Sequence, residues 1–235
     1  MSGLAIVELP SPFDEARVAR MFEALGSDLE GLNDDARCVL AAAAGNAPYL
    51  SRLILRERAW LPRLFSEGPQ RIVDEAMVAA LSAANASDEG NAMALLRGAK
   101  RKAALAIALA DIAGSWDVER VTRALSLFAD ASVKGALRFL LRGAAIRAKL
   151  PERDGATLEA QTGLVVLAMG KYGAFELNYS SDIDLIVFYE PHRFPFRKRD
   201  DARGCCGRYR QRPGQASQRS DCRRLCLPCR SSAAP

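Results

Sequence analysis

At 235 residues, 49% of them hydrophobic, the chain is long enough for one large domain or two small ones with an apolar core. No apolar run reaches the length of a membrane span, and the first twelve residues lack the basic and then apolar pattern of a secretory signal, so we expect a cytoplasmic protein with no membrane partner. The net charge of +5 arises in 197–235, which hold 11 basic and 3 acidic residues, whereas 1–196 hold 22 and 25 and are mildly acidic.

Residues 1–12 carry two prolines, and we expect an extended lead-in there. From 13 to about 150 the sequence is rich in Ala, Leu, Arg and Glu at helical spacing, which predicts an all-helical region. Glycine, proline and short polar residues interrupt this pattern in four places, at 45–48, 68–69, 87–90 and 114–115. Five or six helices are therefore expected.

The last of these predicted helices shows how the region should pack. Asp117 is suited to cap its amino terminus, because a carboxylate can accept hydrogen bonds from the backbone N–H groups of the first turn. The apolar residues that follow recur at helical spacing and should face the core: Val118, Val121, Leu125 and Phe128. Trp60 and Trp116 are interpreted as core anchors rather than ligand contacts.

The main body has one basic cluster, formed by Lys100, Arg101 and Lys102 with Arg97 nearby. Adjacent residues of a helix point in different directions, so three neighbouring charges cannot all face one partner. We interpret the cluster as a solvated helix face.

A polar connector at 150–162 leads to a strand, a turn and a second strand. The apolar run at 164–169 predicts a buried strand, and the step from Gly170 to Gly173 predicts a tight turn. The apolar residues of 183–189 predict the second strand.

Two acids, Asp182 and Asp184, stand at the head of the second strand. Side chains two apart in a strand point the same way, so both carboxylates should project to one side and Ile183 to the other. Such a pair suits magnesium, which usually takes one or two protein carboxylates plus phosphate oxygens and water. The glycines of the turn let backbone N–H groups approach a phosphate, and Ser180 and Ser181 add hydroxyl donors. The constellation predicts nucleotidyl or phosphoryl transfer; the alternative is that Asp-x-Asp merely begins a surface strand.

Two longer motifs carry a resemblance to a known family: Met-Gly-Lys-Tyr-Gly at 169–173 and Glu-Leu-Asn-Tyr-Ser-Ser-Asp-Ile-Asp-Leu at 176–185. Shorter matches lie at 96–117. With them, most of 13–203 resembles the glutamine synthetase adenylyltransferase family, a branch of the DNA polymerase β-like nucleotidyltransferases. The resemblance implies an α+β fold, in which a mostly helical amino-terminal region is followed by the start of a polymerase β-like nucleotidyltransferase domain.

The resemblance also implies roles and partners. Family members carry two transferase domains, and this chain holds only the first, which in the family removes the adenylyl group from a tyrosine of glutamine synthetase by phosphorolysis. Asp182 and Asp184 are then the catalytic residues and the Mg²⁺ ligands. The implied nucleotide- and phosphate-binding set is Gly170, Lys171, Gly173, Ser180 and Ser181. Glutamine synthetase, the PII signalling protein, ATP, ADP and phosphate are the implied partners, and part of the basic cluster could reach the nucleotide phosphates.

The implied nucleotidyltransferase domain, 151–203, is incomplete. In the family a further strand supplies a third metal-binding carboxylate, and that strand and the whole second transferase domain are missing here. Ala168 stands where the family often has glycine, which is a small departure. We therefore expect the chain to be inactive as it stands. The alternative is a non-catalytic helical module that binds glutamine synthetase or the PII protein.

Residues 204–235 form an arginine- and cysteine-rich tail that we expect to be disordered, because it has almost no apolar residues at helical or strand spacing. Three of its cysteines invite a zinc site, with Cys205 and Cys206 as spare ligands, but their spacing matches no common closed site: Cys222, Cys226 and Cys229. Aromatic residues do not interleave with the arginines except at Tyr209, so no nucleic-acid partner is expected.

The genetic code suggests another origin for the tail. When 221–235 are back-translated and the codons are shifted by one base, the string can contain Val-Asp-Leu-Arg-Leu-Arg-Pro, which resembles the family strand that carries the third carboxylate. We therefore predict that the reading frame slips near Gly204.

His192, the chain's one histidine, has no predicted partner and is not expected to act as a general base.

Overall fold

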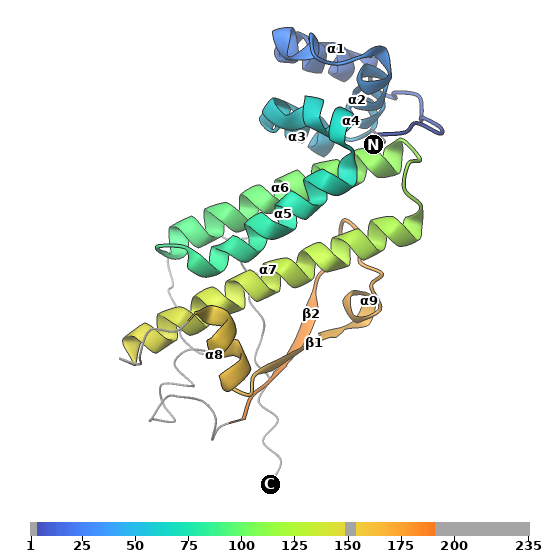
Figure 1. The fold of residues 1–235 in the computed structure, drawn as a ribbon. Coiled ribbons are helices and arrows are strands. Elements are labelled where there is room, and N and C mark those ends of the chain that lie inside the picture. Colours follow the sequence, from blue (N-terminus) through green and yellow to red (C-terminus); the bar gives the residue numbers. More distant parts are fainter. Residues whose placement is uncertain (1–3, 149–153, 191–235) are drawn as a thin grey trace, which may run out of the picture.

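The computed structural model describes residues 4–148 and 154–190. Helices dominate this part of the chain, and a small two-stranded sheet follows them (Figure 1), so the described fold is mostly helical with a minor β component. The helices are α1 (Glu15–Leu25), α2 (Asp34–Asn46), α3 (Pro48–Arg56), α4 (Leu61–Glu67), α5 (Pro69–Ser82), α6 (Glu89–Ile112), α7 (Val118–Arg147), α8 (Gly155–Gln161) and α9 (Gly170–Gly173). The strands are β1 (Val165–Met169) and β2 (Asp184–Phe188). Among the described helices, none combines the length and the apolar character needed to cross a bilayer.

Acidic and amide side chains begin five of the helices. In each case the side chain accepts a hydrogen bond from the backbone N–H three residues later, which satisfies a donor that the first helical turn leaves without a partner. These N-caps are Asp14, Asn33, Asp88, Asp117 and Asp154. The predicted cap at Asp117 is confirmed. Proline occupies the first turn of α3, α4 and α5, where its missing N–H costs no helical hydrogen bond.

All four predicted breaks coincide with helix ends, but the predicted number of helices was too low. The described chain has seven α-helices from α1 to α7, because two of the predicted segments each contain two helices. The 3-10 turn η1 (Gly26–Leu29) separates α1 from α2, and Gly26 begins it with a φ of 51°. A second 3-10 turn, η2 (Arg58–Trp60), separates α3 from α4. The turn η1 begins with Gly26-Ser27, a signal of the kind used at 114–115 that the prediction overlooked, whereas 58–60 contain neither glycine nor proline.

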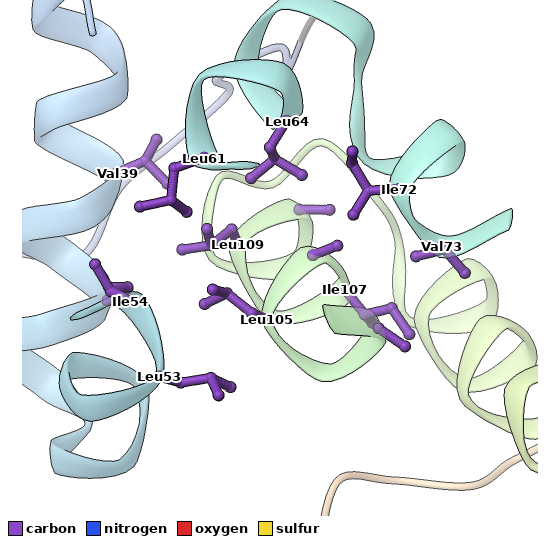
Figure 2. Packing of buried hydrophobic residues seen from close by; sticks show 14 of the residues in the cluster. Val39, Leu53, Ile54, Leu61, Leu64, Ile72, Val73, Leu105, Ile107 and Leu109 are labelled. Carbon is purple, nitrogen blue, oxygen red and sulfur yellow. The ribbon is translucent and has the colours of Figure 1, made fainter. Parts of the chain in front are cut away.

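The hydrophobic core surrounds α6. Leu105, Ile107 and Leu109 are all fully buried, although residues two apart in a helix point in different directions, so other elements cover this helix on several sides. Figure 2 shows these residues among side chains from α2, α3, α4 and α5: Val39, Leu53, Ile54, Leu61, Leu64, Ile72 and Val73. Because burying one aliphatic side chain stabilises a protein by about 1.5–3 kcal/mol, this cluster is the main source of stability.

The predicted core anchors are largely confirmed. Trp116 is buried, and Trp60 packs half-buried against the core. Three of the four residues predicted on the core face of α7 are buried or half-buried: Val121, Leu125 and Phe128. The prediction was wrong for Val118, which is 75% exposed. Val118 is the first residue of α7, and helical side chains point toward the amino terminus, so its side chain extends past the start of the helix into solvent.

The two strands pair antiparallel, with Leu167 opposite Ile186 and Met169 opposite Asp184. Both strands are confirmed, but the prediction that the first is buried was wrong. One face of the sheet is 42–54% exposed at its large apolar side chains: Val165, Leu167, Met169, Ile186 and Phe188. In Figure 1 the sheet lies beside α7, and no further element of the described chain covers its other face. The predicted tight turn at 170–173 is a single turn of helix, α9.

Candidate functional site

The two predicted metal ligands lie at the start of β2. Asp184 is its first residue, and Asp182 precedes it by two. Exposure alternates along this segment: Asp182 and Asp184 are exposed, whereas Ile183 and Leu185 are half-buried. This alternation places both aspartates on the solvent side of the chain, as a strand period of two requires.

The glycine turn lies directly beside Asp184. Gly170 follows Met169, the cross-strand partner of Asp184, and an atom at its missing Cβ position would lie 3.9 Å from Asp184 Oδ2. Gly170 has a φ of 56°, which favours glycine. At Gly173 a Cβ would come within 2.5 Å of the Ala168 carbonyl oxygen, so only glycine lets the turn fold back on β1. The sheet register therefore brings the turn and one aspartate together.

The two serines of the predicted phosphate set belong to a tight polar turn centred on Asn178. The Ser181 hydroxyl donates to Asn178 Oδ1 at 2.8 Å, and the same oxygen accepts from the Ser180 backbone N–H at 3.1 Å. The Asn178 backbone N–H in turn donates to Ser181 Oγ at 3.2 Å. In this structure the hydroxyls therefore shape the turn that leads into Asp182. Asn178 was not among the predicted site residues, although an asparagine before two serines is typical of such a side-chain turn.

Two tyrosine hydroxyls join the site segment to the helices. Tyr172 donates to Asp130 Oδ1 of α7 at 2.6 Å, and Tyr179 donates to Asp111 Oδ2 of α6 at 3.1 Å. Burial raises the pKa of Tyr172 well above its ordinary range, and the hydrogen bond to Asp130 adds to the effect because a phenolate would face a carboxylate. Partial burial and the Asp111 carboxylate raise the pKa of Tyr179 in the same way. Both tyrosines therefore stay neutral donors. Sequence reasoning missed these pairs, since their members are 42 and 68 residues apart.

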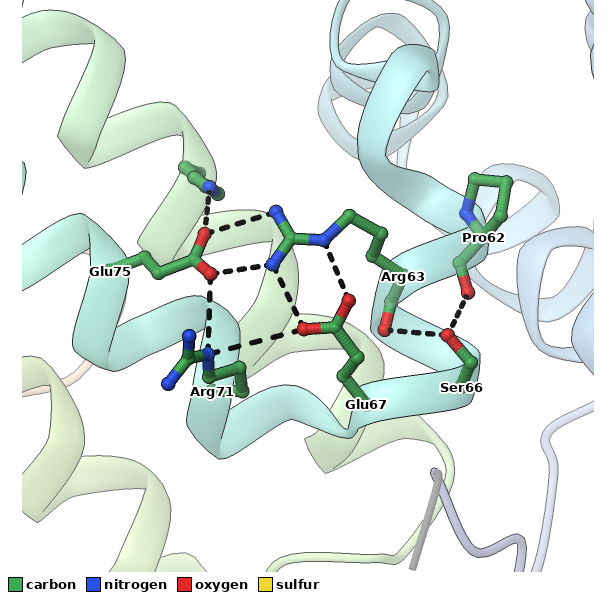
Figure 3. Close-up of polar contacts among 7 residues, drawn as sticks. Pro62, Arg63, Ser66, Glu67, Arg71 and Glu75 are labelled. Carbon is green, nitrogen blue, oxygen red and sulfur yellow. Dashed lines mark hydrogen bonds and ion pairs between the residues drawn. The ribbon is translucent and has the colours of Figure 1, made fainter.

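The basic cluster takes part in ion pairs within the helical region. Lys102 Nζ donates to Glu75 Oε2 at 2.7 Å, and Arg101 Nε donates to Glu57 Oε1 at 2.6 Å. Figure 3 shows Glu75 also held by Arg63, whose guanidinium contacts Glu67 as well. The hydrogen bonds from Arg63 and then from Lys102 lower the pKa of Glu75 to about 2.

These contacts correct the interpretation of the cluster as a solvated face, because Arg101 and Lys102 are half-buried and paired across helices. Only Lys100 of the three is exposed. The chemistry of the pairs is structural, since each cation faces a carboxylate of α5 or of the α3–α4 junction rather than the aspartates of β2.

The donor set at the start of β2 fits a magnesium ion in chemistry. Two exposed carboxylates are the number that Mg²⁺ usually takes from a protein, with phosphate and water oxygens completing its shell. In the described part of the chain, no group of three or more His, Cys, Asp or Glu side chains is placed to hold a metal. Hollows of about 330 and 230 Å³ lie along α5, α6 and α7 and include neither Asp182 nor Asp184. The candidate site is therefore an open surface with two acidic ligands.

Several predictions concern residues outside those that the structure describes. They include His192, the expected disorder of 204–235 and the frame slip near Gly204. The cysteines of the rejected zinc site are also outside: Cys205, Cys206, Cys222, Cys226 and Cys229. These remain predictions from sequence.

Comparison with known proteins extends the resemblance to most of the chain. The family model for glutamate-ammonia ligase adenylyltransferase matches residues 38–209. A bifunctional glutamine synthetase adenylyltransferase/adenylyl-removing enzyme of Rhodopseudomonas palustris strain HaA2 is 50% identical over 157 residues, which are 66% of this chain and 16% of that protein. The enzyme of the same name from Bradyrhizobium diazoefficiens is 44% identical over 183 residues, 75% of this chain and 18% of the relative.

The chain thus spans about a sixth of the length of the curated relatives it matches. No solved structure matches it. A family match over more than half of the chain, together with identities of 44–50% to these relatives, places it securely by sequence. The chain belongs to the glutamate-ammonia ligase adenylyltransferase family.

Proposed function

We propose that this chain is the beginning of the adenylyl-removing half of a cytoplasmic glutamine synthetase regulator, and that its site is built for Mg²⁺ and a nucleotide. The observation that carries the proposal is the closeness of the glycine turn to the acidic pair, with Gly170 beside the carboxylate of Asp184. A surface strand that merely began with Asp-x-Asp would not require glycine at position 170, beside Asp184. The matched family and the names of the relatives support glutamine synthetase as the substrate.

Each residue of the site has a distinct part in the proposed reaction. Asp182 and Asp184 would hold Mg²⁺, which would supply a Lewis acid that neutralises phosphate charge. Gly170 and Gly173 keep the turn free of side chains, so that backbone N–H groups and the exposed Lys171 can approach the phosphates of the nucleotide. Inorganic phosphate attacks the phosphorus of adenylyl-tyrosine, the bond from phosphorus to the tyrosine oxygen breaks, and ADP and unmodified tyrosine are released. Ser180 and Ser181 orient the approach to Asp182 through Asn178.

Metal binding tests the site directly. We expect the 235-residue chain to bind Mn²⁺, a paramagnetic substitute for Mg²⁺, and the double variant D182N/D184N to lose this binding. A matched control is D34N/D35N, which removes two exposed carboxylates in the first turn of α2. If the control lowers Mn²⁺ binding as much as D182N/D184N does, the aspartates of β2 are not a metal site.

We nevertheless expect the chain to be inactive alone, because the described residues place no third acidic side chain with Asp182 and Asp184, whereas the resemblance implies a third carboxylate from a later strand. We expect no phosphate-dependent release of ADP when the chain is mixed with adenylylated glutamine synthetase. Measurable ADP release that disappears in D182N/D184N would show that two carboxylates suffice.

A second candidate function is a non-catalytic module in which the helices dock glutamine synthetase or the PII protein. The observation in its favour is that the main hydrophobic cluster and the Glu75 ion-pair network lie wholly within 4–148, away from the aspartates. Direct binding tests the second candidate: a docking module should bind glutamine synthetase or the PII protein equally well as wild type and as D182N/D184N, and a chain that binds neither protein is not a docking module.

The predicted frame slip is also part of the proposal. The family match ends at residue 209, five residues after Gly204. Sequencing of the gene and its transcript through codon 204 decides this point: an uninterrupted frame there would make the tail a genuine sequence.

A further inference from the structure

One face of α7 contacts the segment that carries the candidate site, residues 170–181. Arg123, Ser126 and Asp130 are spaced by three and four residues, which places them on one side of the helix. Each contacts a different residue of the segment. The guanidinium carbon of Arg123 lies 5.3 Å from the centre of the Phe175 ring, Ser126 Oγ accepts from Leu177 N–H at 3.3 Å, and Asp130 Oδ1 accepts from the Tyr172 hydroxyl at 2.6 Å.

Ser126 is placed to hold the backbone of this segment. The side chain is fully buried, and its hydroxyl donates to the Thr122 carbonyl one turn earlier at 2.8 Å. This bond fixes the direction of the hydroxyl and leaves an oxygen lone pair for the buried Leu177 N–H. A buried backbone N–H without an acceptor costs free energy, so the hydrogen bond to Ser126 Oγ holds the backbone of Leu177 against α7.

Asp130 holds the other end of the segment through Tyr172. The tyrosine is only 4% exposed, and its hydroxyl needs a partner at the helix surface, which Asp130 provides. Tyr172 belongs to α9, the turn that Gly173 presses against β1. The turn is therefore held between the strand on one side and α7 on the other.

The two residues held by α7, Tyr172 and Leu177, are close in sequence to the residues predicted to bind phosphate. Tyr172 lies between Lys171 and Gly173, and Leu177 precedes the Asn178 turn that contains both serines. Asp184, by contrast, is held by its pairing with β1. A shift of the segment away from α7 would thus move the phosphate contacts relative to the metal ligand.

We propose that Ser126 and Asp130 are positioning residues of the nucleotide site, which align the phosphate-binding segment with the acidic pair from the helical region. The alignment itself stands on the contacts above, while its use for a nucleotide rests on the proposed function. The proposal assigns to α7 a role beyond packing, since its loop-facing side chains set the geometry of a site on another element.

The chain offers a matched control for Ser126. Ser132 is also buried on α7 and also donates to the carbonyl four residues earlier, that of Phe128, at 2.9 Å. S126A and S132A therefore remove the same kind of intrahelical bond, but only S126A removes an acceptor from the site segment. For the exposed Asp130, D130N keeps an acceptor oxygen for Tyr172 and D130A removes it.

Two measurements on the full 235-residue chain test the proposal. Amide hydrogen exchange in 170–181 should become faster by about tenfold in S126A and D130A, since the first loses a buried hydrogen bond to this segment and the second a part-buried one. Exchange should stay near wild type in S132A and D130N. Affinity for Mn²⁺ with ADP should fall by about tenfold in S126A and D130A. Affinity for Mn²⁺ alone should stay within about twofold, because Asp184 is held by its pairing with β1 and Asp182 lies only two residues before it.

The outcomes separate this proposal from the proposed function. If S126A and S132A speed exchange equally, or if D130A leaves both measurements unchanged, Ser126 and Asp130 are not positioning residues. If exchange follows the prediction but the wild-type chain binds Mn²⁺ and does not bind ADP, the anchoring stands and the nucleotide function falls. If S126A weakens Mn²⁺ alone as much as Mn²⁺ with ADP, the effect is a general loss of structure and the proposal is overturned.

Discussion

Gly173 has no room for a side chain, so we expect a substitution there to destabilise the protein. A Cβ at Gly173 would lie 2.5 Å from a backbone oxygen of β1, so G173A should destabilise the sheet and turn by about 1–3 kcal/mol. Gly98 of α6 is the control, because a Cβ there would meet nothing nearer than 3.8 Å. G98A should stabilise α6 by about 0.5–1 kcal/mol through helix propensity. Hydrogen exchange in β1 and in α6 measures each effect locally. If G173A leaves the protection of β1 unchanged, a side chain at position 173 does not clash with β1.

Glu75 makes stability depend on pH in a predictable direction. Its pKa falls from an ordinary value near 4.5 to about 2 because Arg63 and Lys102 donate to its carboxylate. A lowered folded-state pKa stabilises the protein above pH 4.5, and this contribution is lost as the pH falls from 4.5 toward 2. We expect E75Q to cost about 1–2 kcal/mol at pH 7, with the difference from wild type shrinking across that window.

Urea unfolding between pH 2 and 7 measures the Glu75 contribution. D74N is the control, because Asp74 is the exposed neighbour of Glu75 on α5 and hydrogen-bonds only Gln70 of its own helix among the bonds described. A constant difference between E75Q and wild type at all pH values would mean that the carboxylate is not selectively stabilised in the folded state.

At the scale of elements, the exposed apolar face of the sheet should cause self-association. Leu167 and Ile186 face each other across the strands, and both are more than 40% exposed. Replacing them together with lysine and glutamate removes apolar surface and introduces an opposite-charge pair at one cross-strand position. L167K/I186E should therefore lower self-association in sedimentation and reduce binding of a hydrophobic dye, without a change in helical content.

Val78 provides the control for the sheet face, since it is 67% exposed but lies on α5. V78K removes a similar exposed aliphatic group from a helix surface and should leave self-association unchanged, because isolated apolar residues are common on protein surfaces. If V78K and L167K/I186E reduce association equally, the sheet is not the associating surface.

The elements also show what local sequence can and cannot specify. The four predicted helix breaks and the cap at Asp117 were correct, because Gly-Pro steps and short acidic caps act within a few residues. The turn at η2 was missed because 58–60 carry no glycine or proline, whereas η1 was missed although Gly26 is a local signal for it. The exposure of β1 could not be predicted either, since an apolar run carries no information about whether a later element covers it.

The same distinction applies to the candidate site. The neighbourhood of Gly170 and Asp184 followed from two adjacent strands, which local pattern can predict. The anchoring of Tyr172 by Asp130 depends on where α7 lies, and the interpretation of Lys102 depended on where α5 places Glu75. Contacts between distant segments are thus the part of the site that the structure adds.

At the scale of the whole molecule, the helical region should be stable without the sheet. The largest hydrophobic cluster lies entirely within 4–148. Residues 154–190 pack on the helices through a separate small cluster of Leu141, Ala145 and Leu158, through the Arg138–Glu159 ion pair, and through the contacts that α6 and α7 make with 170–181. A two-stranded sheet is at best marginal alone. Shortening the chain after residue 148 should therefore destabilise the carboxyl-terminal part of α7, which packs against Leu158, and leave the core around α6 folded.

Tryptophan fluorescence is the appropriate measurement, because Trp60 and Trp116 both lie in the helical region and report its core. In the full chain, hydrogen exchange should show β1 and β2 opening well before the carboxyl-terminal half of α6, where Leu105, Ile107 and Leu109 are fully buried. If the shortened chain instead unfolds at much lower urea, or if the strands and α6 exchange together, the site segment is an integral part of the helical core. The alignment by α7 would then act in both directions, with the site stabilising the helices that position it.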